Sequence, residues 1–310
     1  MKQALLAASI LIILFSNCAG NKLLTYGAIG KDKSLYYYHI GKGEPILIIH
    51  GGPGLNHRYF LPHLERLADN HHLIFYDQKA CGDSEIPADT NAMSVQAFVH
   101  DVDKIRTRFK LRKVHILAHS WGTNLALRYA IQNPQYVSSL ILSNPAATSY
   151  ADVREASKLL NAKFDYQDQQ KRMQIINSDA FKQNDPAAMA DLIRLSFSKN
   201  MALPALADSI QLYYPSDFTQ KNASLKYIFR DLTNYDLYDD CSKITIPTLI
   251  LTGDTDIGLQ AAKKLASAIK SSSFHIIPRA GHFPFIESPR VFDEWVRKFL
   301  GSQFSAKVAN

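Results

Sequence analysis

The sequence predicts an α/β protein with a mostly parallel, doubly wound sheet and a helical cap inserted into it. Short apolar runs alternate with helical patterns, which is typical of doubly wound sheets. Several runs are continuously apolar, as expected of strands buried on both faces of a parallel sheet. A long polar stretch separates two groups of such strands, and 310 residues suffice for a core with an inserted subdomain.

The first residues predict an export signal. Lys2 precedes an apolar stretch, residues 4–15, which has the length of a signal-peptide core and is too short to span a bilayer. The following segment, Phe15-Ser16-Asn17-Cys18-Ala19-Gly20, resembles a bacterial lipoprotein signal in which residues 1–17 are removed and Cys18 is lipidated. Phe15 and Asn17 depart from that pattern, and the alternative is an ordinary secretory signal. We expect a membrane-anchored lipoprotein of the cell envelope, or otherwise a periplasmic or secreted protein.

The first part of the core, residues 18–145, predicts five strands and two helices. Ser94 is the expected N-cap of the first helix, and the second helix ends before Pro134. The predicted strands are residues 35–40, 45–50, 73–76, 114–118 and 137–142, and the predicted helices are residues 94–109 and 122–132.

Residues 146–240 predict a helical cap over the carboxyl edge of the sheet. This stretch is rich in polar residues, has helical patches such as residues 186–197, and lacks a run typical of a buried strand. The core resumes over residues 241–310. It is predicted to have strands at residues 247–252 and 273–277, and a helix at residues 289–300 that begins with Pro289 and ends at Gly301.

The composition is that of an ordinary globular protein. It is 46% hydrophobic and 20% charged, which argues against disorder. The net charge is +7, but the Lys and Arg residues are scattered and no nucleic-acid-binding motif accompanies them, so no nucleic-acid partner is expected. The positive excess favours an anionic membrane surface only weakly.

The cysteines predict neither a disulfide framework nor a metal site. If Cys18 carries lipid, only Cys81 and Cys241 remain, and their spacing is not that of a metal site. We expect two single thiols, although the sequence does not decide whether they pair.

The segment Ala118-His119-Ser120-Trp121-Gly122 predicts a nucleophilic serine. A buried strand runs into it and a helix follows at once, which is the context of a nucleophile elbow. Small residues are needed two positions before and after the serine, because the strand and helix backbones pass close together there. Ala118 and Gly122 meet this need, so we identify Ser120 as the candidate nucleophile.

A glycine-rich turn predicts an oxyanion hole. His50-Gly51-Gly52-Pro53-Gly54 directly follows the buried strand at residues 45–50. Backbone N–H groups of Gly52 and Trp121 are the expected pair of donors to the reacting oxygen. The alternative is a turn in which glycine serves chain geometry alone.

A serine nucleophile requires a base and a group that orients the base. Gly253-Asp254-Thr255-Asp256 and Gly281-His282 each follow a predicted strand, at the edge where α/β sheets place their active sites. His282 is the candidate base. Asp254 and Asp256 compete as the acid, and Asp254 has the alternative of closing a turn.

The other histidines are expected to have structural roles. His50 and His119 flank the glycine turn and the candidate nucleophile, so we expect them to brace these turns. Surface positions or local hydrogen bonds are expected for the remaining ones, which include His57, His63, His71, His72, His100 and His275.

Together these segments resemble the α/β-hydrolase family, and within it the prolyl iminopeptidase-like branch. The resemblance covers about residues 26–145 and 240–303 and departs from the branch at Lys79 and Ala80, where Arg and Gly are usual. It is carried by His50-Gly-Gly-Pro-Gly54, Tyr76-Asp-Gln-Lys-Ala-Cys-Gly-Asp-Ser84, His119-Ser-Trp-Gly122, Gly253-Asp-Thr-Asp256 and Gly281-His282.

The resemblance implies that Asp256 is the acid and that Cys81 lies near the pocket without being the nucleophile. It also implies acyl-enzyme chemistry on a small-molecule or short-peptide substrate, with no metal or organic cofactor.

The substrate is left open between two enzyme classes. The branch implies an aminopeptidase that releases N-terminal proline or a similar residue and grips the free amine with cap glutamates, often beside tryptophan. Here Glu155 is the only Glu between residues 146 and 240, and both Trp121 and Trp295 lie outside that stretch. An esterase or lactonase acting on small acyl groups is the alternative. A non-catalytic surface binding protein on the same scaffold is a third hypothesis.

Overall fold

The computed structural model describes residues 28–32 and 34–308. The predicted signal, residues 1–17, and the predicted lipidation site Cys18 lie outside the described residues. None of the helices in the described ranges combines the length and the apolar character needed to cross a bilayer.

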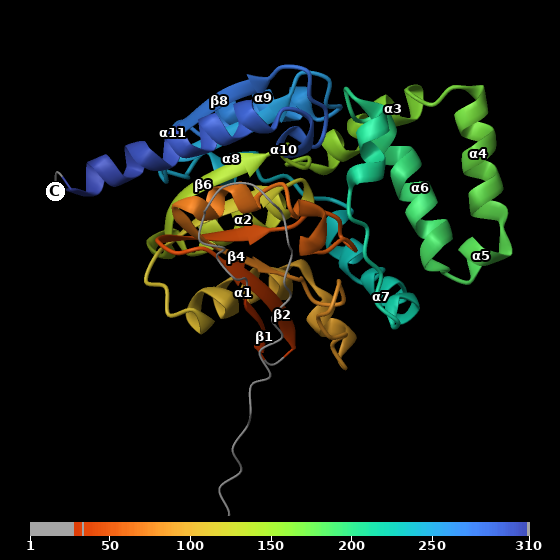
Figure 1. The fold of residues 1–310 in the computed structure, drawn as a ribbon, viewed down its shortest axis with the longest axis horizontal. Helices are drawn as coiled ribbons and strands as arrows, with labels where there is room; N and C mark the ends of the chain where they lie inside the picture. The colour runs from red at the N-terminus through yellow and green to blue at the C-terminus, as the bar shows by residue number, and fades with distance from the viewer. Residues whose placement is uncertain (1–27, 33, 309–310) are drawn as a thin grey trace, which may run out of the picture.

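One eight-stranded sheet forms the centre of the fold (Figure 1), and its strands lie in the order β1-β2-β4-β3-β5-β6-β7-β8. β1 and β2 are antiparallel to their neighbours, and the pairs from β4 to β8 are parallel. The mostly parallel sheet is therefore confirmed. The strands are β1 (Ala28–Asp32), β2 (Leu35–Ile40), β3 (Glu44–Ile49), β4 (His71–Tyr76), β5 (Val114–His119), β6 (Val137–Ser143), β7 (Thr248–Gly253) and β8 (Ser272–Ile277).

Helices cover both faces of the sheet, as a doubly wound fold requires. Alternate residues of β3 belong to two different hydrophobic clusters: Leu47 and Ile49 to one, Ile46 and Ile48 to the other. The first cluster includes residues of α1 (Val95–Arg108), α2 (Trp121–Gln132) and α9 (Leu259–Ala268). The second includes residues of α10 (Pro284–Glu287), α11 (Pro289–Val308) and the 3-10 turns His57–Phe60 and Glu65–Asp69.

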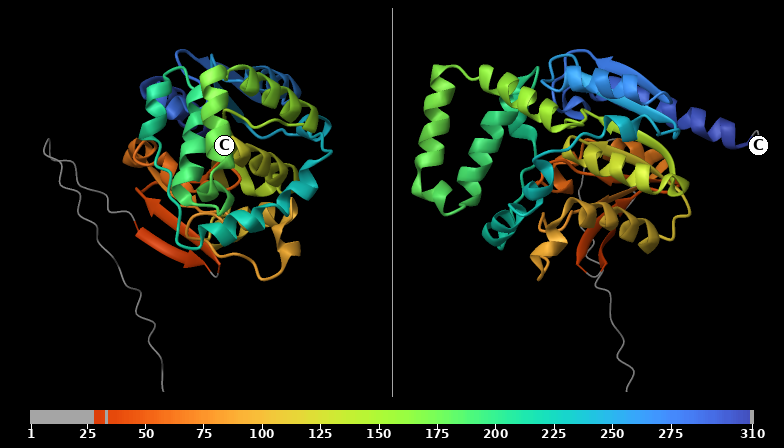
Figure 2. Two further views of the ribbon diagram at one scale, coloured as in Figure 1. Left: turned by 90° about the vertical axis from the view of Figure 1, so that its right-hand side faces the viewer. Right: turned by 180° about the vertical axis from the view of Figure 1, so that it is seen from behind.

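Residues 146–240, called the insertion below, connect β6 to β7. The insertion contains helices and 3-10 turns but no strand of the sheet. Figures 1 and 2 show that α4, α5 and α6 extend away from the sheet. The helices of this region are α3 (Tyr150–Ala162), α4 (Tyr166–Asn177), α5 (Asp179–Lys182), α6 (Pro186–Lys199), α7 (Phe218–Leu225) and α8 (Tyr238–Cys241).

The predicted strands and helices match the structure to within about two residues at most ends, but one helix end was wrong. α11 continues through Gly301 to Val308. A Cβ placed on Gly301 would meet no atom within 4 Å. Glycine weakens an exposed helix by about 1 kcal/mol relative to alanine, which does not by itself end the helix.

β1 and α9 were not predicted. β1 has the sequence AIGKD, which is too polar to indicate a buried strand.

Candidate active site

Ser120 lies in the sharp turn between β5 and α2. Its backbone has φ 52° and ψ −127°, a left-handed conformation that is strained for a residue other than glycine. Ala118 is fully buried, and a Cβ on Gly122 would collide with the carbonyl oxygen of Ile49. The close approach of β3 therefore explains why a glycine follows the serine at this spacing.

The structure brings together the three side chains that the sequence singled out. The Nε2 atom of His282 lies 2.9 Å from the Oγ atom of Ser120, and its Nδ1 atom lies 3.0 Å from the Oδ2 atom of Asp256. These residues follow β5, β7 and β8 at the same edge of the sheet. Asp254 instead accepts hydrogen bonds from the backbone N–H groups of Arg279, at 2.9 Å, and Ala280, at 3.2 Å. Asp254 therefore closes the turn before His282.

Asp256 is buried and fully engaged by donors. Burial alone would raise the pKa of its carboxyl group, but the His282 ring and a hydrogen bond from Asn144 outweigh burial and hold the pKa below its ordinary value. Oδ1 also accepts hydrogen bonds from the N–H of Gly258, at 2.9 Å, and from the amide of Asn200, at 3.1 Å. The aspartate thus stays ionised and holds the imidazole in one orientation.

Two asparagines at this carboxylate were not predicted. Asn144 directly follows β6, and its amide also donates to the carbonyl of Gly281 at 2.8 Å. A polar residue at the carboxyl end of a strand is a signal that could have revealed it. Asn200 is the C-cap of α6, and its carbonyl accepts the N–H of His282 at 2.7 Å. Nothing in the local sequence predicts that the end of an inserted helix reaches this site.

His119 braces the site, as predicted. The hydroxyl of Tyr59 accepts the N–H of Gly51 at 2.7 Å and lies 2.8 Å from Nδ1 of His119. Nε2 of His119 lies 2.8 Å from the carbonyl oxygen of His282, so Nε2 carries the proton and Nδ1 accepts from Tyr59. Burial, followed by the nearby His282, lowers the pKa of His119 to about 3. The ring therefore remains neutral and connects Tyr59, which holds the glycine turn, to the loop that carries His282.

The glycine turn and the start of α2 are tied together by Gln78. Its side chain donates to the carbonyl of His50 at 2.7 Å and accepts the indole N–H of Trp121 at 3.0 Å. Gly52 has φ +127°, a conformation that favours glycine. The N–H of Trp121 is in the first turn of α2, where N–H groups have no acceptor within the helix. Gln78 thus links the start of the glycine turn to the side chain of Trp121, and these two segments carry the N–H groups predicted to bind an oxyanion.

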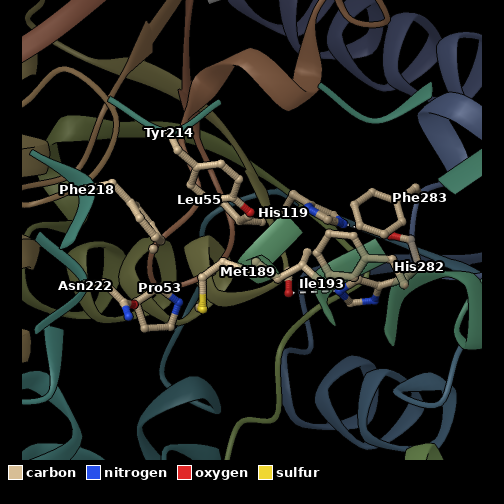
Figure 3. A pocket seen from close by; sticks show the side chains of 14 residues that line it. Pro53, Leu55, His119, Met189, Ile193, Tyr214, Phe218, Asn222, His282 and Phe283 are labelled. Carbon is tan, nitrogen blue, oxygen red and sulfur yellow. Dashed lines mark hydrogen bonds between the residues drawn. The ribbon is translucent and has the colours of Figure 1, made fainter. Parts of the chain in front are cut away.

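Two cavities meet at Ser120. The His282-side cavity, of about 240 Å³, is shown in Figure 3 and is lined by loops at the carboxyl edge of the sheet and by α6 and α7 of the insertion. The Trp121-side cavity, of about 280 Å³, is lined by Gly52, Trp121 and residues of the insertion. Among residues 28–32 and 34–308, no Asp, Glu, Lys or Arg lines either cavity. The space around the serine is therefore largely apolar and carries no fixed charge.

Among the described residues, Cys81 and Cys241 are unpaired, and both are buried. Burial raises the pKa of both thiols to about 12, so both remain protonated at neutral pH. Neither cysteine lines the two cavities at Ser120. Within residues 28–32 and 34–308, no group of three or more His, Cys, Asp and Glu residues has an arrangement that could hold a metal ion.

Comparison with known proteins places the chain in a family. A family model described as "alpha/beta hydrolase fold" matches residues 44–289. The chain belongs to the α/β-hydrolase family. It is 30% identical over 276 residues to a proline iminopeptidase from Heyndrickxia coagulans, covering 84% of this chain and 92% of that protein. It is 28% identical to a proline iminopeptidase from Lactobacillus crispatus, covering 86% of this chain and 94% of that protein.

Solved structures agree with this fold. A crystal structure of a proline iminopeptidase from Mycobacterium smegmatis has a TM-score of 0.64 at 20% identity and covers 91% of this chain and 99% of that chain. A thermophilic esterase from Thermogutta terrifontis also has a TM-score of 0.64 at 20% identity, over 87% of this chain and 93% of that chain. The relatives place this α/β-hydrolase in the prolyl iminopeptidase-like branch, and the protein is a hydrolytic enzyme of that type.

Proposed function

We propose that this α/β-hydrolase is a serine hydrolase that forms an acyl-enzyme at Ser120. The observation that carries the proposal is the continuous chain of contacts from the serine hydroxyl through His282 to the buried carboxylate of Asp256. This arrangement lets the imidazole accept the hydroxyl proton as the oxygen attacks, while the carboxylate stabilises the imidazolium that forms.

The reaction proceeds in two halves. Oγ of Ser120 bonds to the substrate carbonyl carbon as its proton passes to Nε2 of His282, and the N–H groups of Gly52 and Trp121 stabilise the oxyanion. His282 then donates that proton to the leaving atom as its bond to the carbonyl carbon breaks. In the second half water attacks the acyl carbon, His282 accepts the water proton, and the proton returns to Ser120 as the acid product leaves.

The first candidate substrate is a peptide with N-terminal proline or a similar residue. The proline iminopeptidases that are similar to this chain over most of its length support an aminopeptidase. In this reaction the prolyl group is the acyl part and the remainder of the peptide is the leaving group.

The second candidate is an esterase or lactonase acting on a neutral acyl group, and the lining of the cavities favours it. An N-terminal amine is protonated near neutral pH, and a buried cation requires a counter-charge or dense hydrogen bonding. No acidic residue in the described part of the chain lines either cavity, and Glu155 is on the exposed surface of α3. An uncharged acyl group meets no such cost.

A fluorophosphonate probe tests the chemistry, and a substrate panel tests the substrate class. The probe should label folded wild-type protein at Ser120 and should not label Ser120→Ala. Absence of labelling in folded wild-type protein would exclude the acyl-enzyme proposal and favour a non-catalytic binding protein. Prolyl and alanyl arylamides assayed beside short-chain aryl esters then separate the candidates. Ester turnover without arylamide release would remove the aminopeptidase.

We also propose that the protein is exported and held on a membrane by lipid at Cys18. The lipoprotein-like segment at residues 15–20 supports this. Expression of the full chain and of Cys18→Ser, followed by membrane fractionation, tests the proposal. Equal membrane retention of both proteins would exclude lipid attachment at Cys18.

A further inference from the structure

The candidate base lies on a short loop whose main chain is held as firmly as its side chain. Gly281, His282 and Phe283, called the histidine loop below, lie between β8 and α10. Figure 3 shows the side chains of His282 and Phe283 at the His282-side cavity. The imidazole can stay at Ser120 only if the main chain that carries it is fixed. The inference below rests on the function proposed above, in which His282 is the base.

Glu287 accepts hydrogen bonds from the histidine loop on both sides of the base. This buried residue is the last of α10, and its Oε2 atom accepts the N–H of Gly281 at 2.9 Å and the N–H of Phe283 at 3.2 Å. The N–H of His282 itself donates to the carbonyl of Asn200 at 2.7 Å. Buried backbone N–H groups need acceptors. Two of the three in this loop therefore depend on one carboxylate oxygen.

The second oxygen of Glu287 holds the insertion. Oε1 accepts the N–H of Ala202 at 2.7 Å and the N–H of Leu203 at 3.2 Å, in the segment that follows α6. This segment lies directly against the histidine loop, because a Cβ placed on Gly281 would collide with the carbonyl oxygen of Asn200. One carboxylate thus joins the histidine loop to the insertion.

The number of donors explains why the residue is a glutamate. A carboxylate has two oxygens that both accept hydrogen bonds, which matches four N–H groups arranged as two pairs. A glutamine of nearly the same size has one oxygen and one NH2 group. Whichever way its amide is turned, the NH2 group faces two N–H donors, so one of the two connections is lost. Replacement by glutamine therefore separates hydrogen bonding from packing.

We propose that Glu287 is a positioning residue for the base. It joins the histidine loop to the insertion and so keeps Nε2 of His282 within reach of the Ser120 hydroxyl. Glu287 lines neither cavity, so it acts through His282 and does not contact the substrate. A displacement of a catalytic group by about 1 Å can lower the rate by about 100-fold, which makes the conformation of this loop important for turnover.

The first test is the order of activity among three proteins. The substrate is 4-nitrophenyl butyrate or prolyl 4-nitroanilide, whichever the wild type turns over. Glu287→Gln should lower kcat by about 10- to 100-fold, the effect of losing hydrogen bonds to a charged group and displacing the base. KM should stay within about threefold, because the cavity walls are unchanged. Glu287→Asp keeps both acceptor oxygens on a shorter side chain, so its kcat should lie between the other two.

The second test observes the base directly. In protein with isotope-labelled histidine, proton NMR reports the hydrogen between Nδ1 of His282 and the carboxylate of Asp256. This signal should shift or broaden in Glu287→Gln. Glu65→Gln is the matched control, because Glu65 is also partly buried and accepts a hydrogen bond, from the Tyr38 hydroxyl at 3.1 Å. It should keep both the wild-type signal and the wild-type kcat.

Two results would overturn the inference. One is a folded Glu287→Gln protein with wild-type kcat and NMR signal, even if its Tm falls, because the carboxylate would then serve stability alone. The other is a higher kcat in Glu287→Gln than in Glu287→Asp, which would indicate a packing role. If Glu287→Gln does not fold, Glu287→Asp is measured in the same two ways, and wild-type values for both would overturn the inference.

Fluorophosphonate labelling separates these failures from failure of the proposed function. A wild-type protein that is labelled at Ser120, together with an unaffected Glu287→Gln variant, removes only the role of Glu287. A folded wild-type protein that is not labelled removes both.

Discussion

The carboxyl edge of the sheet and the insertion differ in how far their side chains are buried and hydrogen-bonded. At the sheet edge, Asp256, Asn144 and His119 are buried, and each is hydrogen-bonded to a residue that follows another strand. In the insertion, α3 and α4 have no buried residue, and Tyr166 and Met173 on α4 are 77% and 52% exposed. The sheet edge thus sets the reaction geometry, whereas the insertion mostly supplies walls for the cavities.

The largest effect should come from the buried carboxylate. Asp256→Asn should lower kcat by about 10³- to 10⁴-fold, because the imidazole loses its ionic partner and adopts the wrong tautomer. Steady-state kinetics on the best substrate of the panel measure this. Asp254→Asn is the control and should stay within a few-fold of wild type. A large loss in Asp254→Asn with a small loss in Asp256→Asn would reverse the assignment of the acid.

Asn200 tests a place where the insertion reaches the carboxylate of Asp256. Asn200→Ala removes the hydrogen bonds to Asp256, at 3.1 Å, and to the N–H of Ile257, at 3.0 Å. A hydrogen bond to a charged group contributes about 1.5–3 kcal/mol, so kcat should fall by about 10-fold or more. Asn161→Ala on exposed α3 should leave kcat unchanged. Equal kinetics for the two variants would show that the insertion does not support the base.

Acid should destabilise the core rather than the insertion. All 11 histidines lie outside residues 146–240, and burial lowers the pKa of His119 to about 3. Between that value and the unfolded value of about 6.5 the unfolded chain binds more protons, so the free energy of unfolding falls as pH falls.

One such histidine contributes a loss of about 2 kcal/mol between pH 7 and pH 5. Urea unfolding of wild type, His119→Asn and the exposed control His100→Asn measures this loss. The pH dependence should be smaller in His119→Asn alone. An identical slope for all three proteins would contradict the burial of a neutral His119.

The smallest effect should come from the exposed face of α4. Tyr166→Ser with Met173→Gln should change the free energy of unfolding by less than about 0.5 kcal/mol per site and leave kcat/KM unchanged. Chemical denaturation and the substrate panel measure both quantities. A loss of several kcal/mol would show that this face is packed, and the contrast between the two regions would then be wrong.

The sequence predicted the sheet well because continuous apolar runs have few alternatives. The segments around Ser120, Asp256 and His282 could be identified because each follows such a run, and parallel strands end at one edge. The edge strand β1 and the continuation of α11 past Gly301 depend on pairing and on weak local preferences, which a single sequence does not reveal. Asn200 reaches Asp256 through a tertiary contact 56 residues away in sequence, so its role needed coordinates.

The end of α6 connects the wall of one cavity to the residues that orient His282. Met189, Ile193 and Phe197 on α6 wall the His282-side cavity, and Asn200, which caps the same helix, holds the main chain of His282 and the side chain of Asp256. A substrate group too bulky for this cavity would push this helix outward and tilt the imidazole at the same time. Poor fit would then slow acylation in addition to weakening binding, because the same helix sets both the size of the cavity and the orientation of the imidazole.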